Sequence, residues 1–234
     1  MALKNKTCTG IITLTLVLAQ VPAYAAGISI GEGASLDLGT AIVDVNCGSL
    51  TTAGQLHLAS GSLIGLNDVD IASAGSILGD SGTLELAGDW RNAGSFTPSA
   101  SDVQIQDGCG QSTSSITGDT DFHIFRATTT SGKTLSVQAD SLQTFSGGLQ
   151  LEGVAPNDRL SIRSSVSGQQ AHFVLIAPGV QQIAAVDVRD NDASLGQPLA
   201  PGVVEQFESV DSGNNLNWFT ALLDLIFQDS FETK

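Results

Sequence analysis

An acidic segment near the C-terminal end of the chain holds the residues best suited to chemistry. Asp187, Asp190 and Asp192 lie within six residues, with Arg189 among them. Carboxylate oxygens close in sequence suit a hard cation such as Ca2+. Two positioned carboxylates suit polysaccharide hydrolysis, and a base beside a positive charge suits lyase chemistry. Asp187, Asp190 and Asp192 are therefore the candidates for a cation or saccharide contact, although a run such as 190–192 is more often a solvated turn.

Other catalytic and metal-binding signatures are missing from the sequence. His57 and His123 lie between apolar neighbours in alternating segments, so they should point outward, and no second ligand stands at a zinc-like spacing. The segment 31–33 lacks the lysine of a phosphate-binding loop, and no Gly-x-Ser-x-Gly elbow is present. We therefore expect a protein that is not an enzyme and that has no metal centre and no cofactor. A calcium ion at the acidic segment is the less favoured alternative.

The first 25 residues have the pattern of a secretory signal peptide. Lys4 and Lys6 precede an apolar run over 11–21, and small residues follow at 23–25. A membrane anchor is the alternative, but a spanning helix needs about 20 apolar residues, more than this run supplies. We expect cleavage after residue 25 or 26 and no membrane span in the mature chain.

Export would place the remaining cysteines in an oxidising compartment. Cys8 leaves with the signal peptide, so Cys47 and Cys109 remain. Disulfides persist in such compartments, which predicts a Cys47–Cys109 bridge, with two buried free thiols as the alternative.

The charge of the chain excludes one class of partner. The formal net charge is −15, and cleavage makes it more negative because it removes two lysines. Such a surface repels nucleic acids and anionic membranes. We therefore expect no nucleic-acid partner.

Short segments of alternating apolar and polar residues predict the strands that would position the candidate residues. From Leu36 onward, apolar-x-apolar triplets recur every six to eight residues, separated by glycine, serine and threonine. Alternation over three residues followed by glycine is typical of a short strand and a turn, whereas a coiled coil with this spacing would not tolerate the glycines. Three units add to about 20 residues, which predicts one coil of a right-handed parallel β-helix, or β-solenoid. The inward positions would then be Leu36, Leu38, Val43, Val45, Leu56, Leu58, Leu84 and Leu86, and the outward ones Asp37, Asp44, Asp70 and Glu85.

The composition divides the all-β chain into parts. No aromatic residue occurs over 26–89, whereas all nine phenylalanines and both tryptophans follow residue 89. We expect one β-solenoid domain over 26–219, with an aromatic-free part at 26–89 and an aromatic-containing part at 90–219. The last strand of that domain is expected near 203–207, and residues 220–234 form a C-terminal tail or capping element.

Several segments resemble the repeats of large secreted bacterial β-helical surface proteins. They are the run 82–96 (GTLELAGDWRNAGSF), the run 122–125 (FHIF) and the run 149–153 (LQLEG). The resemblance implies an extended, adhesin-like protein without catalytic residues. The chain differs from those proteins in having a single short array.

The tail is similar to an ending found on exported proteins of Gram-negative bacteria. It reads Ile-Phe-x-Asp-x-Phe-Glu over 226–232. The resemblance implies a sorting or outer-surface signal. The alternative is an amphipathic segment that caps the open end of the solenoid.

Together these features predict a secreted protein, extracellular or on the outer surface of a Gram-negative bacterium. The favoured function is a non-catalytic structural or adhesion module whose partner is a surface ligand or polysaccharide. The alternative is a carbohydrate-active β-helix, a polysaccharide lyase or hydrolase, that uses the acidic 187–192 region.

Overall fold

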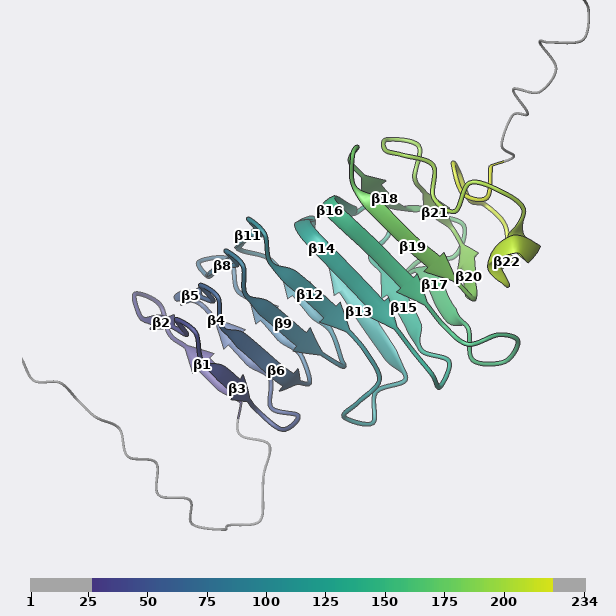
Figure 1. Ribbon diagram of the computed structural model, residues 1–234. Helices are drawn as coiled ribbons and strands as arrows, with labels where there is room; N and C mark the ends of the chain where they lie inside the picture. The colour runs from purple at the N-terminus through teal and green to yellow at the C-terminus, as the bar shows by residue number, and fades with distance from the viewer. Residues whose placement is uncertain (1–26, 221–234) are drawn as a thin grey trace, which may run out of the picture.

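The computed structural model describes residues 27–220, which form a parallel β-solenoid of about eight turns (Figure 1). The expected signal peptide lies outside these residues, and so does the tail after its first residue. No helix within 27–220 is long and apolar enough to cross a membrane. The all-β parallel fold predicted from the spacing is confirmed.

The chain winds through three sheets, which we call sheets A, B and C. Sheet A contains nine strands: β1 (Ile28–Ile30), β4 (Leu50–Thr52), β7 (Val69–Ile71), β10 (Trp90–Asn92), β13 (Thr113–Thr117), β15 (Thr134–Val137), β17 (Leu160–Ser164), β20 (Val186–Arg189) and β22 (Val210–Asp211). Sheet B contains β2 (Ser35–Asp37), β5 (Gln55–His57), β8 (Ser76–Leu78) and β11 (Ser95–Thr97). Sheet C contains β3 (Ile42–Asp44), β6 (Ser62–Leu66), β9 (Thr83–Leu86), β12 (Asp102–Ile105), β14 (Thr120–Thr128), β16 (Leu142–Glu152), β18 (Ala171–Leu175) and β21 (Asn191–Asp192), and β19 (Val180–Ala184) also pairs with β16.

The register between coils follows the repeat of about 20 residues. In sheet B, Leu36 lies beside Leu56, which lies beside Ile77. In sheet C, Val43 lies beside Leu63, which lies beside Leu84. Like side chains therefore stack along the axis, and the backbone groups of each coil pair with those of the coils on either side.

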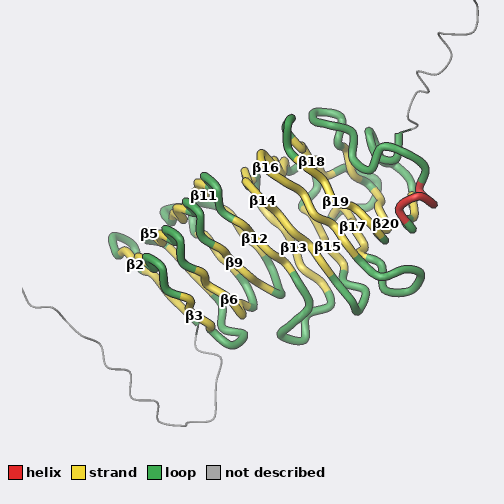
Figure 2. Tube along the Cα trace, viewed as in Figure 1, coloured by secondary structure: helices red, strands yellow, loops and turns green. Residues whose placement is uncertain are grey.

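The coil changes shape where aromatic residues enter the core. The first four coils have three short strands, whereas no strand after β11 joins sheet B in the described part of the chain (Figure 2). The later coils carry long strands such as β14 and β16 instead. From the fourth coil onward the interior holds a stack of aromatic rings with neighbouring centroids 4.8–5.9 Å apart, formed by Trp90, Phe96, Phe122, Phe125, Phe145 and Phe173. The core remains continuous from Ile30 to Trp218.

Most of the expected inward and outward positions are confirmed. Leu56, Leu58, Leu84 and Leu86 are buried, and Leu38 and Val45 are nearly so. Leu36 and Val43 are only partly buried; both lie on strands of the first coil, which have a neighbouring coil on one side alone. The four acidic residues between these positions are exposed or half-buried: Asp37, Asp44, Asp70 and Glu85.

One predicted strand is wrong. The segment expected to be a strand near 203–207 forms a 3-10 helix, η1 (Val204–Phe207). None of its residues is buried, so no inward row of side chains draws it into a sheet. The segment around η1 instead folds at the C-terminal end of the stack, where Trp218 packs against Phe173 with ring centroids 6.4 Å apart.

The predicted disulfide is present and connects distant coils. Cys47 follows β3 in the first coil, Cys109 follows β12 in the fourth, and their sulfur atoms are 2.10 Å apart. The Cys109 loop runs back along the corner of the solenoid, where Gln111 Nε2 donates to Asn67 Oδ1 at 3.1 Å. Buried Lys133 holds the same loop, because its Nζ donates to the carbonyl oxygens of Gln111 and Ala87.

Removal of this bridge should lower stability substantially. The bond closes a sequence separation of 62 residues. In the chain-entropy model such a loop contributes about 4 kcal/mol to the free energy of unfolding. We expect the double variant Cys47→Ser with Cys109→Ser to unfold at a lower urea concentration, and reduced wild-type protein to match it. Equal unfolding midpoints for the oxidised wild type and the double variant would contradict this role.

Candidate functional site

The acidic segment predicted to bind a cation or saccharide is spread over two sheets. Asp187 lies on β20 in sheet A, where it pairs with Arg163 at 2.7 Å and accepts from Ser212 Oγ at 2.6 Å. Asp192 lies on β21 in sheet C, 3.5 Å from His172 Nδ1.

Asp190 occupies the corner between these strands. Its φ is +58°, in the left-handed region, and at this residue the chain turns from sheet A to sheet C. Its carboxylate is buried and accepts from Asn214 Nδ2 at 2.7 Å and from the Gly168 amide at 3.1 Å. These two hydrogen bonds, with help from the charge of Arg189, lower the pKa of Asp190.

The three carboxylates therefore have separate partners. Within residues 27–220, no group of three or more histidine, cysteine, aspartate or glutamate side chains is arranged to hold a metal ion. The corner at Asp190 turns the chain between the two flanking strands, which is why closeness in sequence does not bring Asp187 and Asp192 together. The segment consists of an ion pair of Asp187 with Arg163 on sheet A, Asp192 beside His172 on sheet C, and the Asp190 carboxylate, which closes the turn.

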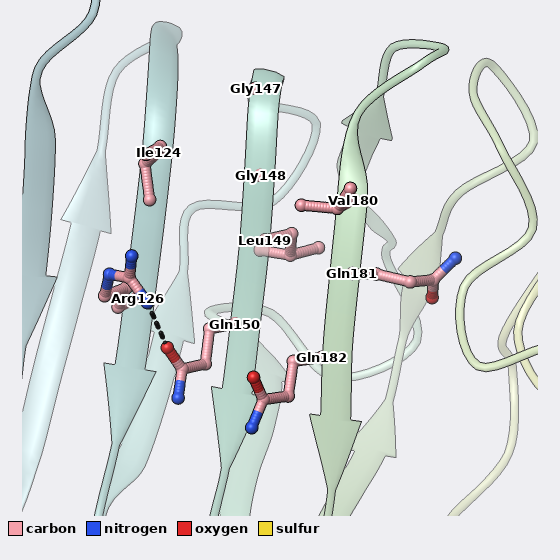
Figure 3. A pocket seen from close by; sticks show the side chains of 9 residues that line it. All are labelled: Ile124, Arg126, Gly147, Gly148, Leu149, Gln150, Val180, Gln181 and Gln182. Carbon is pink, nitrogen blue, oxygen red and sulfur yellow. Dashed lines mark hydrogen bonds between the residues drawn. The ribbon is translucent and has the colours of Figure 1, made fainter.

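A depression on the outer face of sheet C is the best-formed candidate for ligand binding. It measures about 280 Å3 and lies over β14, β16 and β19 (Figure 3). Gly147 and Gly148 form its floor, with apolar side chains on either side and polar side chains at one end. We call it the Gly148 depression; its lining residues are Ile124, Arg126, Gly147, Gly148, Leu149, Gln150, Val180, Gln181 and Gln182.

The polar end of the depression belongs to a longer row of side chains in register. Five successive strands of sheet C place long polar side chains at equivalent positions. They are Glu85, Gln104, Arg126, Gln150 and Gln182. We call this set the polar row.

Hydrogen bonds fix the conformation of the polar row. Arg126 Nε donates to Asp102 Oδ2 at 2.8 Å, and Arg126 Nη1 donates to the Gln150 side-chain oxygen. Gln150 Nε2 donates to Glu152 Oε2 at 2.7 Å, and Gln182 Nε2 donates to the other oxygen of Glu152. The network spans four strands, so these side chains are held in place before any ligand arrives.

A second row of outward positions explains why the depression is hollow. Asp102, Ile124, Gly148 and Val180 occupy equivalent positions on adjacent strands. Gly148 is the member without a side chain, so the row is interrupted between Ile124 and Val180. Next to it, the imidazole of His123 covers Gly147, where an added Cβ would come within 2.5 Å of His123 Cε1.

The chemistry of the Gly148 depression is that of binding. Amide groups and one guanidinium group offer hydrogen bonds, and Ile124 and Val180 offer apolar contact. The positive charge of Arg126 is balanced by Asp102, and the nearby Glu152 carboxylate accepts from neutral amides, so the polar end has no excess of positive charge. No motif in the sequence predicted this site, although two consecutive glycines inside a strand are a recognised sign of a bulge or a close backbone approach.

His57 forms an ionisable cluster with two carboxylates on sheet B. Its Nδ1 lies 3.0 Å from Asp37 and its Nε2 lies 2.7 Å from Asp80, so it bridges carboxylates from the coils on either side. The hydrogen bonds to Asp80 and then Asp37 raise the pKa of His57 above its usual value of 6.5. This is an ion-pair ladder across sheet B.

The His57 ladder predicts a pH-dependent stability. A raised pKa in the folded state contributes stability that is complete below the unfolded pKa and is lost as the pH rises through the folded pKa. We expect an NMR titration of His57 to show a midpoint above 6.5. Asp80→Asn should move that midpoint down, and His57→Gln should remove the loss of stability from this pH range. A His57 midpoint at or below 6.5 in the wild type would contradict the ladder.

Comparison of the chain with family models, with curated proteins and with solved structures found no match. The residues and geometry described above are therefore the basis for the functional proposal.

Proposed function

We propose that the protein is exported and acts as a non-catalytic β-solenoid module, extracellular or on the outer surface of a Gram-negative bacterium, in adhesion or surface structure. The observation that carries this proposal is the Cys47–Cys109 disulfide, which ties the first coil to the fourth. A bond of this kind persists in oxidising compartments and is rare in the cytosol. The signal-peptide pattern of the first 25 residues and the resemblance of the tail support the same location.

The outer faces of the solenoid support the role of a binding or structural module. The polar row is held by hydrogen bonds among its own members and with Asp102 and Glu152, on a sheet that runs nearly the length of the described chain. Such a surface offers a pre-formed contact area for a surface ligand or a polysaccharide. The resemblance to adhesin-like repeats points in the same direction.

The carbohydrate-active alternative has less support. It required Asp187, Asp190 and Asp192 to converge in one groove, whereas Asp187 and Asp192 lie on different sheets with separate ionic partners. No observation favours it over the binding module, and we do not propose it.

Expression of the full chain in a Gram-negative host tests the proposal. We expect the mature protein in the medium or at the cell surface, with Ala26 or Gly27 as its first residue. Neither cysteine should react with an alkylating agent before reduction. A variant that lacks residues 2–25 is the control, and it should stay in the cytoplasm. An uncleaved cytoplasmic product with two reactive thiols would contradict export.

The same purified protein tests the absence of catalysis. We expect incubation with a panel of polysaccharides to release no new reducing ends and no unsaturated products. Turnover that Asp187→Asn or Asp192→Asn abolishes, with the fold retained, would instead support the carbohydrate-active alternative.

A further inference from the structure

We propose that the Gly148 depression binds a neutral, hydroxyl-rich glycan, with one or two sugar rings over the glycine floor. The inference rests on the proposed function, because it names the ligand class that one face of the module receives. It depends on three features of the depression: the glycine at its floor, the polar groups at its end and its dimensions.

The fold does not require a glycine at position 148. Gly148 does not have the left-handed backbone that favours glycine, and an added Cβ would meet nothing nearer than Val180 Cγ2 at 3.5 Å, an ordinary contact. Gly147 differs, because His123 occupies the space that its side chain would need. A glycine in a strand interior weakens the strand, and it often marks a bulge or a place where a ligand approaches closely. The register of β14 against β16 shifts immediately before Gly148, so the missing side chain at 148 accompanies this bulge and also opens the depression.

The polar groups suit hydroxyl groups. Gln150 and Gln182 present side-chain amides, and within residues 27–220 the Gln182 Oε1 atom has no protein donor. Amides both donate and accept, as sugar hydroxyls do.

The charge of the site favours a neutral ligand. Arg126 is paired with Asp102, whereas Glu152 accepts from two neutral amides and keeps its negative charge, so the polar groups repel an anion. An anionic glycan would also meet the negative charge of the chain, formally −15.

The size and walls suit a sugar ring. The volume of about 280 Å3 is near the lower end of small-molecule sites, which span about 300–1,000 Å3. Ile124 and Val180 flank the floor, and Val180 is 71% exposed, so both can contact the C–H face of a pyranose (Figure 3). A peptide that adds as a strand is a poorer occupant, because β16 already pairs with β14 on one side and with β18 and β19 on the other.

An NMR titration of the mature, disulfide-bonded protein labelled with 15N tests the inference. The probes are maltohexaose, cellohexaose and mannohexaose, with oligogalacturonate as the charged comparison. We expect at least one neutral hexasaccharide to shift the amide signal of Gly148 and the side-chain amide signals of Gln150 and Gln182.

Three variants locate the binding. Gly148→Leu fills the depression and should weaken the affinity roughly tenfold or more. Gly31→Leu is the control for the glycine-to-leucine change itself, because an added Cβ at Gly31 would meet no atom within 4 Å and Gly31 lies next to β1, away from the depression. The affinity of this variant should be unchanged. Gln182→Ala removes only one amide and should weaken binding roughly threefold, which keeps the test valid if Gly148→Leu does not fold.

Three results would overturn the inference: no binding by any neutral hexasaccharide, unchanged affinity in both Gly148→Leu and Gln182→Ala, or binding of oligogalacturonate alone. Export and the disulfide are measured in separate experiments. Failure of the glycan site therefore leaves the proposed function standing, and failure of export leaves the titration interpretable.

Discussion

The structure depends on in-register hydrogen bonding between successive coils. Each strand inside a sheet pairs its backbone groups with the strands one coil before and one coil after, and only the strands at the two ends of a sheet pair on one side. An unpaired buried amide or carbonyl is costly, so the register is not free to slip. A shift by one residue would also turn every inward leucine or phenylalanine outward. Register therefore determines both the core and the pattern of side chains on the outer faces.

Much of the fold could be predicted from the first third of the chain. There the coils have nearly equal lengths, and the leucine and valine pairs repeat so regularly that Leu36, Leu56 and Ile77 could be aligned by spacing alone. The disulfide could be predicted from the number of cysteines in the mature chain and from the oxidising compartment expected for it. The segment at 203–207 was mispredicted because Val203, Val204 and Phe207 mimic a strand pattern, although the segment lies at the end of the stack and buries none of η1.

The candidate site could not be predicted in the same way. Gln150 and Gln182 lie on neighbouring strands, but the intervening coil is longer than the early repeat and contains β17 and β18 as well. A bulge near His123 shifts the register between β14 and β16, so no fixed period leads to the alignment of Ile124 with Gly148. In the acidic segment the sequence misleads in the other direction. Its three carboxylates are close in sequence, but a corner of the solenoid separates them. In a β-solenoid, residues at equivalent positions on adjacent coils are neighbours in space even when they are far apart in the sequence.

Cross-linking across sheet C tests the register, on which both the fold and the Gly148 depression depend. Neighbouring strands lie about 4.8 Å apart, and a disulfide needs a Cα–Cα distance of about 4.4–6.8 Å. Cysteines that replace Gln150 and Gln182, which are paired in the structure, should form a bond under mild oxidation, as detected by mass spectrometry. Cysteines that replace Gln150 and Ala184, two residues out of register, should not. Equal cross-linking of the two pairs, or cross-linking of the second pair alone, would contradict the register and the arrangement of the outer face built on it.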